Sequence, residues 1–269
     1  FVTVLKHLKD EFPELRIGGP ALTCMNEAYF TDLLKACKAA GVAPDFISWH
    51  YYGQNPDEMT SAAEKARRLC DGLGFTACEL ILNEWHYIQS WEGVQSKNAT
   101  PEEVRKAHEG PAGVSNIDSA CFTLSSLIKF QSSKLDMANF YGCAHTGNWG
   151  YLDNYKQLNK VGHALRLFGS IVRDYPVICA SGSSAPAVTT LAVRSADGRR
   201  RALLVSDYRG EKGTLEIAVK GAEGAKSVSS VLLDHTHNAV PCAAEWKDGT
   251  LKLTKADGNS AAYLITFEY

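Results

Sequence analysis

The chain has 269 residues, of which 45% are hydrophobic and 22% are charged, and its formal net charge is −2. These values are typical of a globular protein with one large domain or two ordinary ones. The sequence has no basic stripe of the kind that binds nucleic acid, and no apolar run of the roughly 18 residues that a membrane-spanning helix needs. We therefore expect neither a nucleic-acid partner nor insertion into a membrane.

Eight cysteines are spread along the chain without a C-x-x-C pair or another metal-binding spacing. The sequence therefore predicts no metal site and no cofactor. Cys37, Cys70 and Cys121 fall within helical patterns and are expected to be small buried residues. An even number of cysteines allows disulfides without requiring any. The compartment stays open, with a secreted or periplasmic location favoured over the cytoplasm.

Strand and helix patterns alternate through the first two thirds of the chain. This order is typical of a parallel α/β fold. The polar connection at 88–114 follows the third strand, carries a capping box at Thr100 and Glu103, and is long enough that we expect it to shape a substrate cleft. The expected strands are 15–21, 45–53, 75–82 and 137–141, and the expected helices are 1–12, 27–40, 57–73, 115–131 and 160–172.

The pattern changes after Pro176 to short alternating runs separated by turn residues, with no helical period. Short strands at this spacing indicate an all-β sandwich. We therefore predict an α/β domain over 1–172 and a β-sandwich domain over 173–269. The expected strands of the second domain are 187–193, 201–206, 213–219, 228–233, 250–253 and 261–267.

Polar and aromatic residues follow the expected parallel strands. Glu84 ends the third strand, His50 and Tyr52 lie toward the end of the second, and Trp149 follows the fourth. Each alone is better explained by structure than by chemistry: an acid at a strand end that faces water or pairs with an arginine, or a histidine or tryptophan that packs. The carboxyl ends of parallel strands meet at one face, where (β/α) barrels place their active sites. The occurrence of several polar and aromatic residues at the same end of successive strands therefore favours a functional site.

Three segments in this order resemble glycoside hydrolase family 39, which includes β-xylosidases and α-L-iduronidases. They are residues 18–21 (Gly-Gly-Pro-Ala), residues 46–52 (Phe-Ile-Ser-Trp-His-Tyr-Tyr) and residues 82–85 (Leu-Asn-Glu-Trp). In that family they belong to the ends of barrel strands five, six and seven. Residues 149–152 resemble the exit of strand eight. The resemblance covers about residues 1–172, and it implies the C-terminal half of a TIM (β/α)8 barrel followed by a β-sandwich.

The resemblance implies roles for single residues. Glu84 would be the nucleophile of a retaining glycosidase, and Tyr52 would orient it by hydrogen bonding. Trp149 would be a platform for the sugar ring. The residues implied to bind substrate are His50, Tyr52, Asn83, Trp85, His145 and Trp149.

Two departures from the family pattern stand out. Asn83 precedes Glu84 where the family commonly has Thr or Ser. The acid/base carboxyl and barrel strands one to four are expected upstream of Phe1, so this chain alone is expected to be inactive. Asp45 and Glu79 lie at strand beginnings, the wrong end of a barrel. Glu92 and Glu109 in the long connection stay open as alternative candidates for the acid/base carboxyl.

Several functional hypotheses follow from these patterns. The first is a retaining glycosidase of the β-xylosidase kind, acting on a carbohydrate substrate. A close variant is another member of the same clan, such as an arabinofuranosidase or an endo-acting glycanase. A different class is a carbohydrate-binding or scaffold fragment without catalysis. Half a barrel exposes apolar strand edges, so we expect a partner: the missing N-terminal half, on the same gene product or a second chain, or a homodimer mate.

Overall fold

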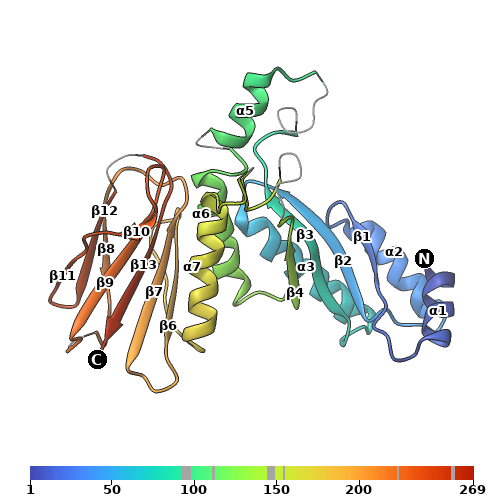
Figure 1. The fold of residues 1–269 in the computed structure, drawn as a ribbon. Helices are drawn as coiled ribbons and strands as arrows, with labels where there is room; N and C mark the ends of the chain where they lie inside the picture. The colour runs from blue at the N-terminus through green and yellow to red at the C-terminus, as the bar shows by residue number, and fades with distance from the viewer. Residues whose placement is uncertain (92–97, 111–112, 144–148, 154, 223, 256–257) are drawn as a thin grey trace. The chain divides into compact units, whose positions relative to one another are not determined.

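The computed structural model describes every residue except 92–97, 111–112, 144–148, 154, 223 and 256–257. The chain divides into two units (Figure 1). The strands of the first unit pair in parallel, and the strands of the second pair antiparallel. The first unit contains Phe1–His86 and Lys129–Tyr141, and the second contains Tyr87–Ile128 and Gly142–Tyr269.

Four strands form the sheet of the first unit, in the order β1-β2-β3-β4. β1 pairs with β2 and β3 pairs with β4, both in parallel. β2 and β3 also run the same way, because Glu79 N–H donates to the Asp45 carbonyl where both begin, and Tyr52 meets Glu84 further along. The predicted parallel α/β pattern is therefore confirmed. The bounds are β1 Gly19–Leu22, β2 Phe46–Gly53, β3 Glu79–Tyr87 and β4 Met137–Phe140.

Three helices connect or precede these strands, and α2 packs against both α1 and α3 (Figure 1). Asn26 and Asn55 begin α2 and α3 as N-caps, because each side-chain oxygen accepts a backbone N–H of the first turn. α3 ends at Gly74, whose φ of 91° lies in the left-handed region that glycine tolerates. The bounds are α1 Val2–Glu11, α2 Glu27–Ala39 and α3 Pro56–Leu73.

The two faces of β2 have different surroundings. Ile47 and Trp49 are buried, and the Trp49 ring meets Phe30 of α2 edge to face, with 6.3 Å between ring centroids. His50 and Tyr52 point to the opposite face, because side chains alternate along a strand. The helices thus cover one face of the strand, and the polar side chains of the other face are left for a site.

β3 differs from its prediction. The sequence pattern places the strand at 75–82 with Glu84 at its tip, but the strand is Glu79–Tyr87 and Glu84 lies inside it. Phe75 and Cys78 close a turn through a backbone hydrogen bond, so the chain is not yet extended there. The last three residues of the strand are completely buried, and this burial explains why pairing continues past the acid.

The second unit contains three helices. The predicted capping box of α5 is confirmed: the Glu103 N–H donates to Thr100 Oγ1 at 3.3 Å, and the Thr100 N–H donates to Glu103 Oε2 at 2.7 Å. α6 is buried along most of its length, and α7 packs against β9 and β10. The bounds are α5 Pro101–Glu109, α6 Ile117–Phe130 and α7 Lys160–Asp174.

Nine antiparallel strands follow α7 among the described residues, in sheets ordered β10-β9-β13-β7-β6-β5 and β11-β12-β8. The sequence predicted six of them. The three it missed, β5, β10 and β11, are three or four residues long, too short for an alternating pattern. The bounds are β5 Val177–Cys179, β6 Val188–Arg194, β7 Arg200–Asp207, β8 Gly213–Ala218, β9 Ser227–Leu233, β10 Asn238–Pro241, β11 Glu245–Lys247, β12 Thr250–Lys255 and β13 Ala261–Glu268.

The two antiparallel sheets share one hydrophobic core. Leu203 of β7 and Phe267 of β13 belong to the six-stranded sheet, and Leu251 of β12 belongs to the three-stranded sheet; all lie in the same buried cluster. Lys255 and Asp207 form an ion pair of 2.7 Å between the sheets, with side chains only 4% and 2% exposed. The sheets are therefore joined by apolar packing and by one buried charge pair.

α6 is joined to the six-stranded sheet by hydrogen bonds. Ser206 Oγ of β7 donates to the Cys121 carbonyl at 2.9 Å, and Asp118 accepts from Arg209 Nε and from Ser260 Oγ at 2.8 and 2.6 Å. These contacts place most of α6 in the same unit as the antiparallel strands. The division into units thus follows contacts rather than the change in sequence pattern, and the boundary at 172 stays a prediction.

Candidate active site

Glu84 is held at the polar face of the parallel sheet by side chains from the neighbouring strand. Tyr52 donates its hydroxyl hydrogen to Glu84 Oε2 at 2.8 Å, and His50 Nδ1 lies 3.3 Å from the same oxygen. The Glu84 side chain is 35% exposed and the His50 side chain 19%. Both donors that the described residues provide meet Oε2. Oε1 has no hydrogen-bond donor among the described residues.

Tyr52 is suited to remain a donor. Burial raises the pKa of its hydroxyl far above the usual tyrosine value, and the hydrogen bond to Glu84 raises it further. The phenol therefore keeps its proton at any physiological pH and stays able to donate it to the Glu84 carboxyl group. The geometry that the family resemblance implied for this pair is present.

Asn83 approaches the other side of the His50 ring. Its Nδ2 lies 3.2 Å from His50 Nε2. Asn83, His50 and Glu84 thus form a chain in which the imidazole lies between an amide and a carboxylate. The sequence predicts that Asn83 binds substrate. In the structure its side-chain nitrogen instead contacts the imidazole of His50.

Trp85 requires a correction. The resemblance implied that its indole lines the substrate site, but the residue is completely buried. Its ring packs edge to face against Phe130 and Phe140, at centroid distances of 5.2 and 5.1 Å. In β3 it alternates with Glu84 and therefore points away from the carboxylate. Trp85 is a core residue of the first unit.

Tyr141 was missed by the sequence argument. It follows β4 directly, is 44% exposed, and meets the Tyr52 ring edge to face with 6.3 Å between centroids. The signal was available, because an aromatic residue just after a parallel strand occupies the end where barrel sites form. The sequence pattern instead makes it the last residue of the strand expected at 137–141.

The carboxylates at the strand beginnings are engaged elsewhere. Asp45 is paired with Lys9 Nζ at 2.6 Å, and its Oδ2 also accepts the Ile17 N–H at 2.7 Å. Glu79 forms an ion pair with Arg16. Both carboxylates are therefore engaged in ion pairs at the beginnings of their strands, and that neither is the second acid of the site stays a prediction.

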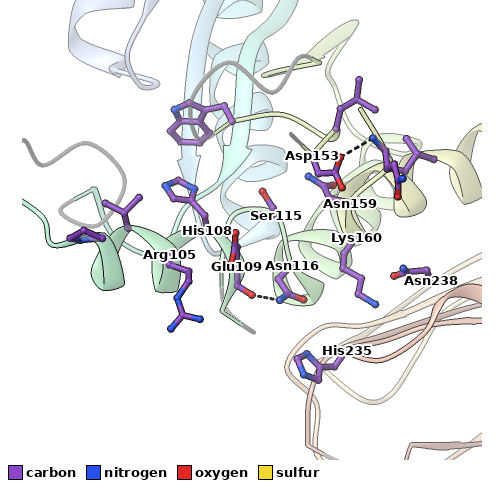
Figure 2. Close-up of a pocket in the computed structure, with 16 residues that line it drawn as sticks. Arg105, His108, Glu109, Ser115, Asn116, Asp153, Asn159, Lys160, His235 and Asn238 are labelled. Carbon is purple, nitrogen blue, oxygen red and sulfur yellow. Dashed lines mark hydrogen bonds between the residues drawn. The ribbon is translucent and has the colours of Figure 1, made fainter. Parts of the chain in front are cut away.

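The remaining predicted residues belong to the second unit or lie outside the described residues. His145 is among the latter, as is Glu92. Trp149 is half-buried, and its ring lies 6.1 Å from that of Trp91. It lines a pocket of about 680 Å³ in the second unit, to which Glu109 also contributes (Figure 2).

Basic side chains from three elements line this pocket. Arg105 comes from α5, Lys160 from the first turn of α7, and His235 from the turn between β9 and β10 (Figure 2). Lys160 donates to the His237 carbonyl at 3.0 Å, and burial lowers its pKa. No sequence motif marks these residues, because they are brought together from distant segments.

Two further observations bear on the class of protein. No helix among the described residues is long and apolar enough to cross a lipid bilayer. The described part of the chain also holds no group of three or more acidic, histidine or cysteine side chains arranged to bind a metal ion.

Solved structures resemble this chain, although no protein-family model and no curated protein sequence matches it. A glucosidase from Croceicoccus marinus aligns with 100% of this chain and 63% of its own, at a TM-score of 0.72 and 21% identity. A GH30 endoxylanase from Clostridium papyrosolvens C71 aligns at a TM-score of 0.62 and 12% identity. A GH51 α-L-arabinofuranosidase from Thermotoga petrophila RKU-1 aligns at 0.64 and 18%.

At these identities the likeness shows the fold and nothing finer. The chain is covered at 100% by the endoxylanase and at 99% by the arabinofuranosidase, and it spans 60% of the length of each. It therefore has the fold of about three fifths of a glycoside hydrolase chain.

Proposed function

We propose that this chain is the C-terminal part of a retaining glycoside hydrolase. In this proposal residues 1–172 form the second half of a (β/α)8 barrel and residues 173–269 form a β-sandwich. The parallel strands, the two antiparallel sheets with a shared core, and the likeness to glycosidase structures support it. The observation that carries the function is Glu84, which is held by Tyr52 and His50 on the polar face of a parallel sheet.

The proposed chemistry needs Glu84 and one group from outside this chain. Glu84 Oε1 attacks the anomeric carbon while the bond to the leaving oxygen breaks, and that oxygen takes a proton from the external acid/base carboxyl. This step leaves the sugar bound covalently to Glu84 Oε1. The same external group then removes a proton from water, whose oxygen attacks the anomeric carbon as the bond to Glu84 Oε1 breaks, so that the sugar is released with retained configuration and the Glu84 carboxylate is restored. Retaining enzymes hold their two carboxyls about 5–5.5 Å apart.

The substrate we propose is a xyloside or a related glycan, as the family 39 motifs imply. The names of the similar structures, a glucosidase, an endoxylanase and an arabinofuranosidase, describe those proteins. They define the panel of substrates to be compared. The aryl glycosides of xylose, glucose and arabinofuranose, together with xylan, separate exo-acting from endo-acting enzymes within the same assay.

The test uses the full gene product, or this chain co-expressed with the upstream segment, and compares Glu84→Gln with Glu79→Gln. Both residues lie on β3, but Glu79 is paired with Arg16 at the opposite end of the strand. We expect Glu84→Gln to abolish turnover and Glu79→Gln to retain it. A 2-deoxy-2-fluoro glycoside should label the peptide that contains Glu84. Labelling of another carboxylate would overturn the assignment.

The non-catalytic reading makes a different prediction in the same experiment. A carbohydrate-binding or scaffold fragment would bind glycans in a titration but turn over none of the panel, and the fluoro glycoside would label nothing. Reconstituted protein that binds sugars without any turnover would therefore favour the binding-module alternative over the glycosidase.

A further inference from the structure

His50 lies between an amide and a carboxylate, and each faces a different ring nitrogen. Asn83 Nδ2 is 3.2 Å from Nε2, and Glu84 Oε2 is 3.3 Å from Nδ1. The His50 side chain is 19% exposed. The two neighbours determine which nitrogen carries a proton, because one of them can only donate and the other can only accept.

The amide nitrogen of Asn83 has hydrogens and no lone pair to offer, so it donates and Nε2 must accept. Nε2 is then without a proton. An ionised Glu84 accepts only, so Nδ1 must carry the hydrogen. The ring that satisfies both neighbours is neutral, with its single proton on Nδ1.

The opposite orientation of the Asn83 amide would give a different ring. Its oxygen would face Nε2, which would then need a proton, and His50 would be a positively charged imidazolium. That orientation would also place the NH2 group where Oδ1 now lies buried without a partner among the described residues. An NH2 group brings two donors that need partners, whereas the oxygen leaves only an acceptor unpaired, so the observed orientation is the less costly one.

We propose that Asn83 is a positioning residue that holds His50 as the neutral tautomer with its proton on Nδ1. In this state the ring donates a hydrogen bond to Glu84 without placing a positive charge beside it. A full ion pair would withdraw charge from the carboxylate and weaken it as a nucleophile, whereas a neutral donor only orients it. The catalytic part of this role rests on the proposed function of Glu84, but the tautomer does not.

The tautomer is measured directly by NMR of the protein labelled with 15N-histidine, at about pH 8, above the ordinary histidine pKa of about 6.5. His50→Gln identifies the resonances of His50. We expect Nδ1 to be of the protonated type and Nε2 of the unprotonated type. A protonated Nε2 in the unaltered protein would overturn the proposal.

Variants of Asn83 test whether this residue sets the state. Asn83→Asp puts an acceptor in front of Nε2, and we expect Nε2 to gain a proton. Asn83→Leu removes the donor, and we expect the proton of the His50 ring to be shared between Nδ1 and Nε2. Asn139→Asp adds the same charge on β4 at an exposed position and should leave His50 unchanged. If the His50 signals of both Asn83 variants match the unaltered protein, the proposal is wrong.

Kinetics of the complete enzyme separate the positioning role from the proposed function. We expect Asn83→Asp to lower kcat about tenfold with little change in KM, because orientation and charge of the nucleophile are altered rather than sugar binding. A changed tautomer with unchanged kcat would overturn the positioning role. An enzyme inactive on every glycoside would overturn the proposed function, and the NMR result on the tautomer would still stand.

Discussion

At the scale of single residues, the hydrogen bond from Tyr52 to Glu84 is the contact most directly tied to the proposed chemistry. It orients Oε2, and the raised pKa of the phenol keeps the donor in place. Hydrogen bonds to charged groups contribute about 1.5–3 kcal/mol. A contact of that size is large enough to be read in kinetics while the fold stays intact.

The first prediction concerns Tyr52→Phe in the complete enzyme. We expect kcat/KM to fall about 10- to 100-fold, which corresponds to the loss of one hydrogen bond to a charged group. Tyr51→Phe is the matched control, because that hydroxyl donates to the Asn55 carbonyl and contacts Glu58 instead. Equal loss of activity in both variants would show that the effect is structural.

Burial separates the tryptophans that the sequence could not distinguish. Trp85 is completely enclosed by the first unit, whereas Trp91 is 45% exposed. Replacement of a buried tryptophan by alanine costs about 3–5 kcal/mol, since it leaves a cavity. We therefore expect Trp85→Ala to lower the free energy of unfolding by that amount in a denaturant titration. Trp91→Ala should change it by less than about 0.5 kcal/mol; a similar effect of both would contradict the assignment of Trp85 to the core.

At the scale of elements, Asp45 joins three segments at the start of the parallel sheet. Its carboxylate pairs with Lys9 of α1 and accepts the Ile17 N–H before β1, and its carbonyl accepts the N–H of Glu79 at the start of β3. Burial alone would raise its pKa, but the hydrogen bonds from Lys9 and Ile17 outweigh burial and hold the pKa below its ordinary value.

Because the pKa of Asp45 is lowered in the folded protein, the stability that this carboxylate contributes depends on pH. A group whose pKa is lower in the folded protein stabilises it above the unfolded pKa of about 3.9, and this contribution is lost as pH falls through the folded pKa. We expect Asp45→Asn to cost about 1 kcal/mol near pH 7, with the difference shrinking below about pH 4. Urea titrations across pH measure this.

A second aspartate serves as the control for that series. Asp10 is 64% exposed and pairs with Lys6 along the surface of α1 at 3.4 Å. Exposed pairs of this kind contribute little, so Asp10→Asn should leave stability unchanged within about 0.5 kcal/mol at every pH. A pH-independent effect of Asp45→Asn would show that it acts through packing rather than through its charge.

At the scale of the whole molecule, the parallel sheet ends in β1 on one side and β4 on the other, and neither has a further strand partner among the described residues. An edge strand presents unpaired backbone N–H and C=O groups, which proteins usually cover or pair with another strand. The similar structures are longer, and this chain spans 63% of the first of them. We infer that other strands complete the sheet.

The prediction at this scale is complementation. We expect the upstream half of the barrel, expressed as a separate chain, to form a one-to-one complex and to raise the melting temperature. The gain in stability arises because anything that binds only the folded state shifts the unfolding equilibrium. Analytical ultracentrifugation measures the stoichiometry. A homodimer of this chain that excludes the upstream half would favour a second copy as the partner. A stable monomer that does not bind the upstream half would contradict both kinds of partner.

Much of the fold was predictable because its signals are local. The helices of the first unit have regular apolar spacing, α2 and α3 are capped by Asn26 and Asn55, and the long strands alternate regularly. The extent of β3 was not predictable, because its last three residues continue the strand where the surrounding tertiary structure buries them. The short strands β5, β10 and β11 are set by neighbouring strands, and their own residues carry no pattern.

Local patterns along the chain were enough to predict the alternation of strands and helices, the change to antiparallel strands, and a short set of candidates that contains Glu84, His50 and Tyr52. Tertiary structure alone decided which candidates meet. It joined Tyr52 and His50 to Glu84, turned Asn83 toward His50, and buried Trp85. The physical reason is that local patterns specify which face a side chain takes, whereas hydrogen-bond partners and burial depend on segments far apart in the chain.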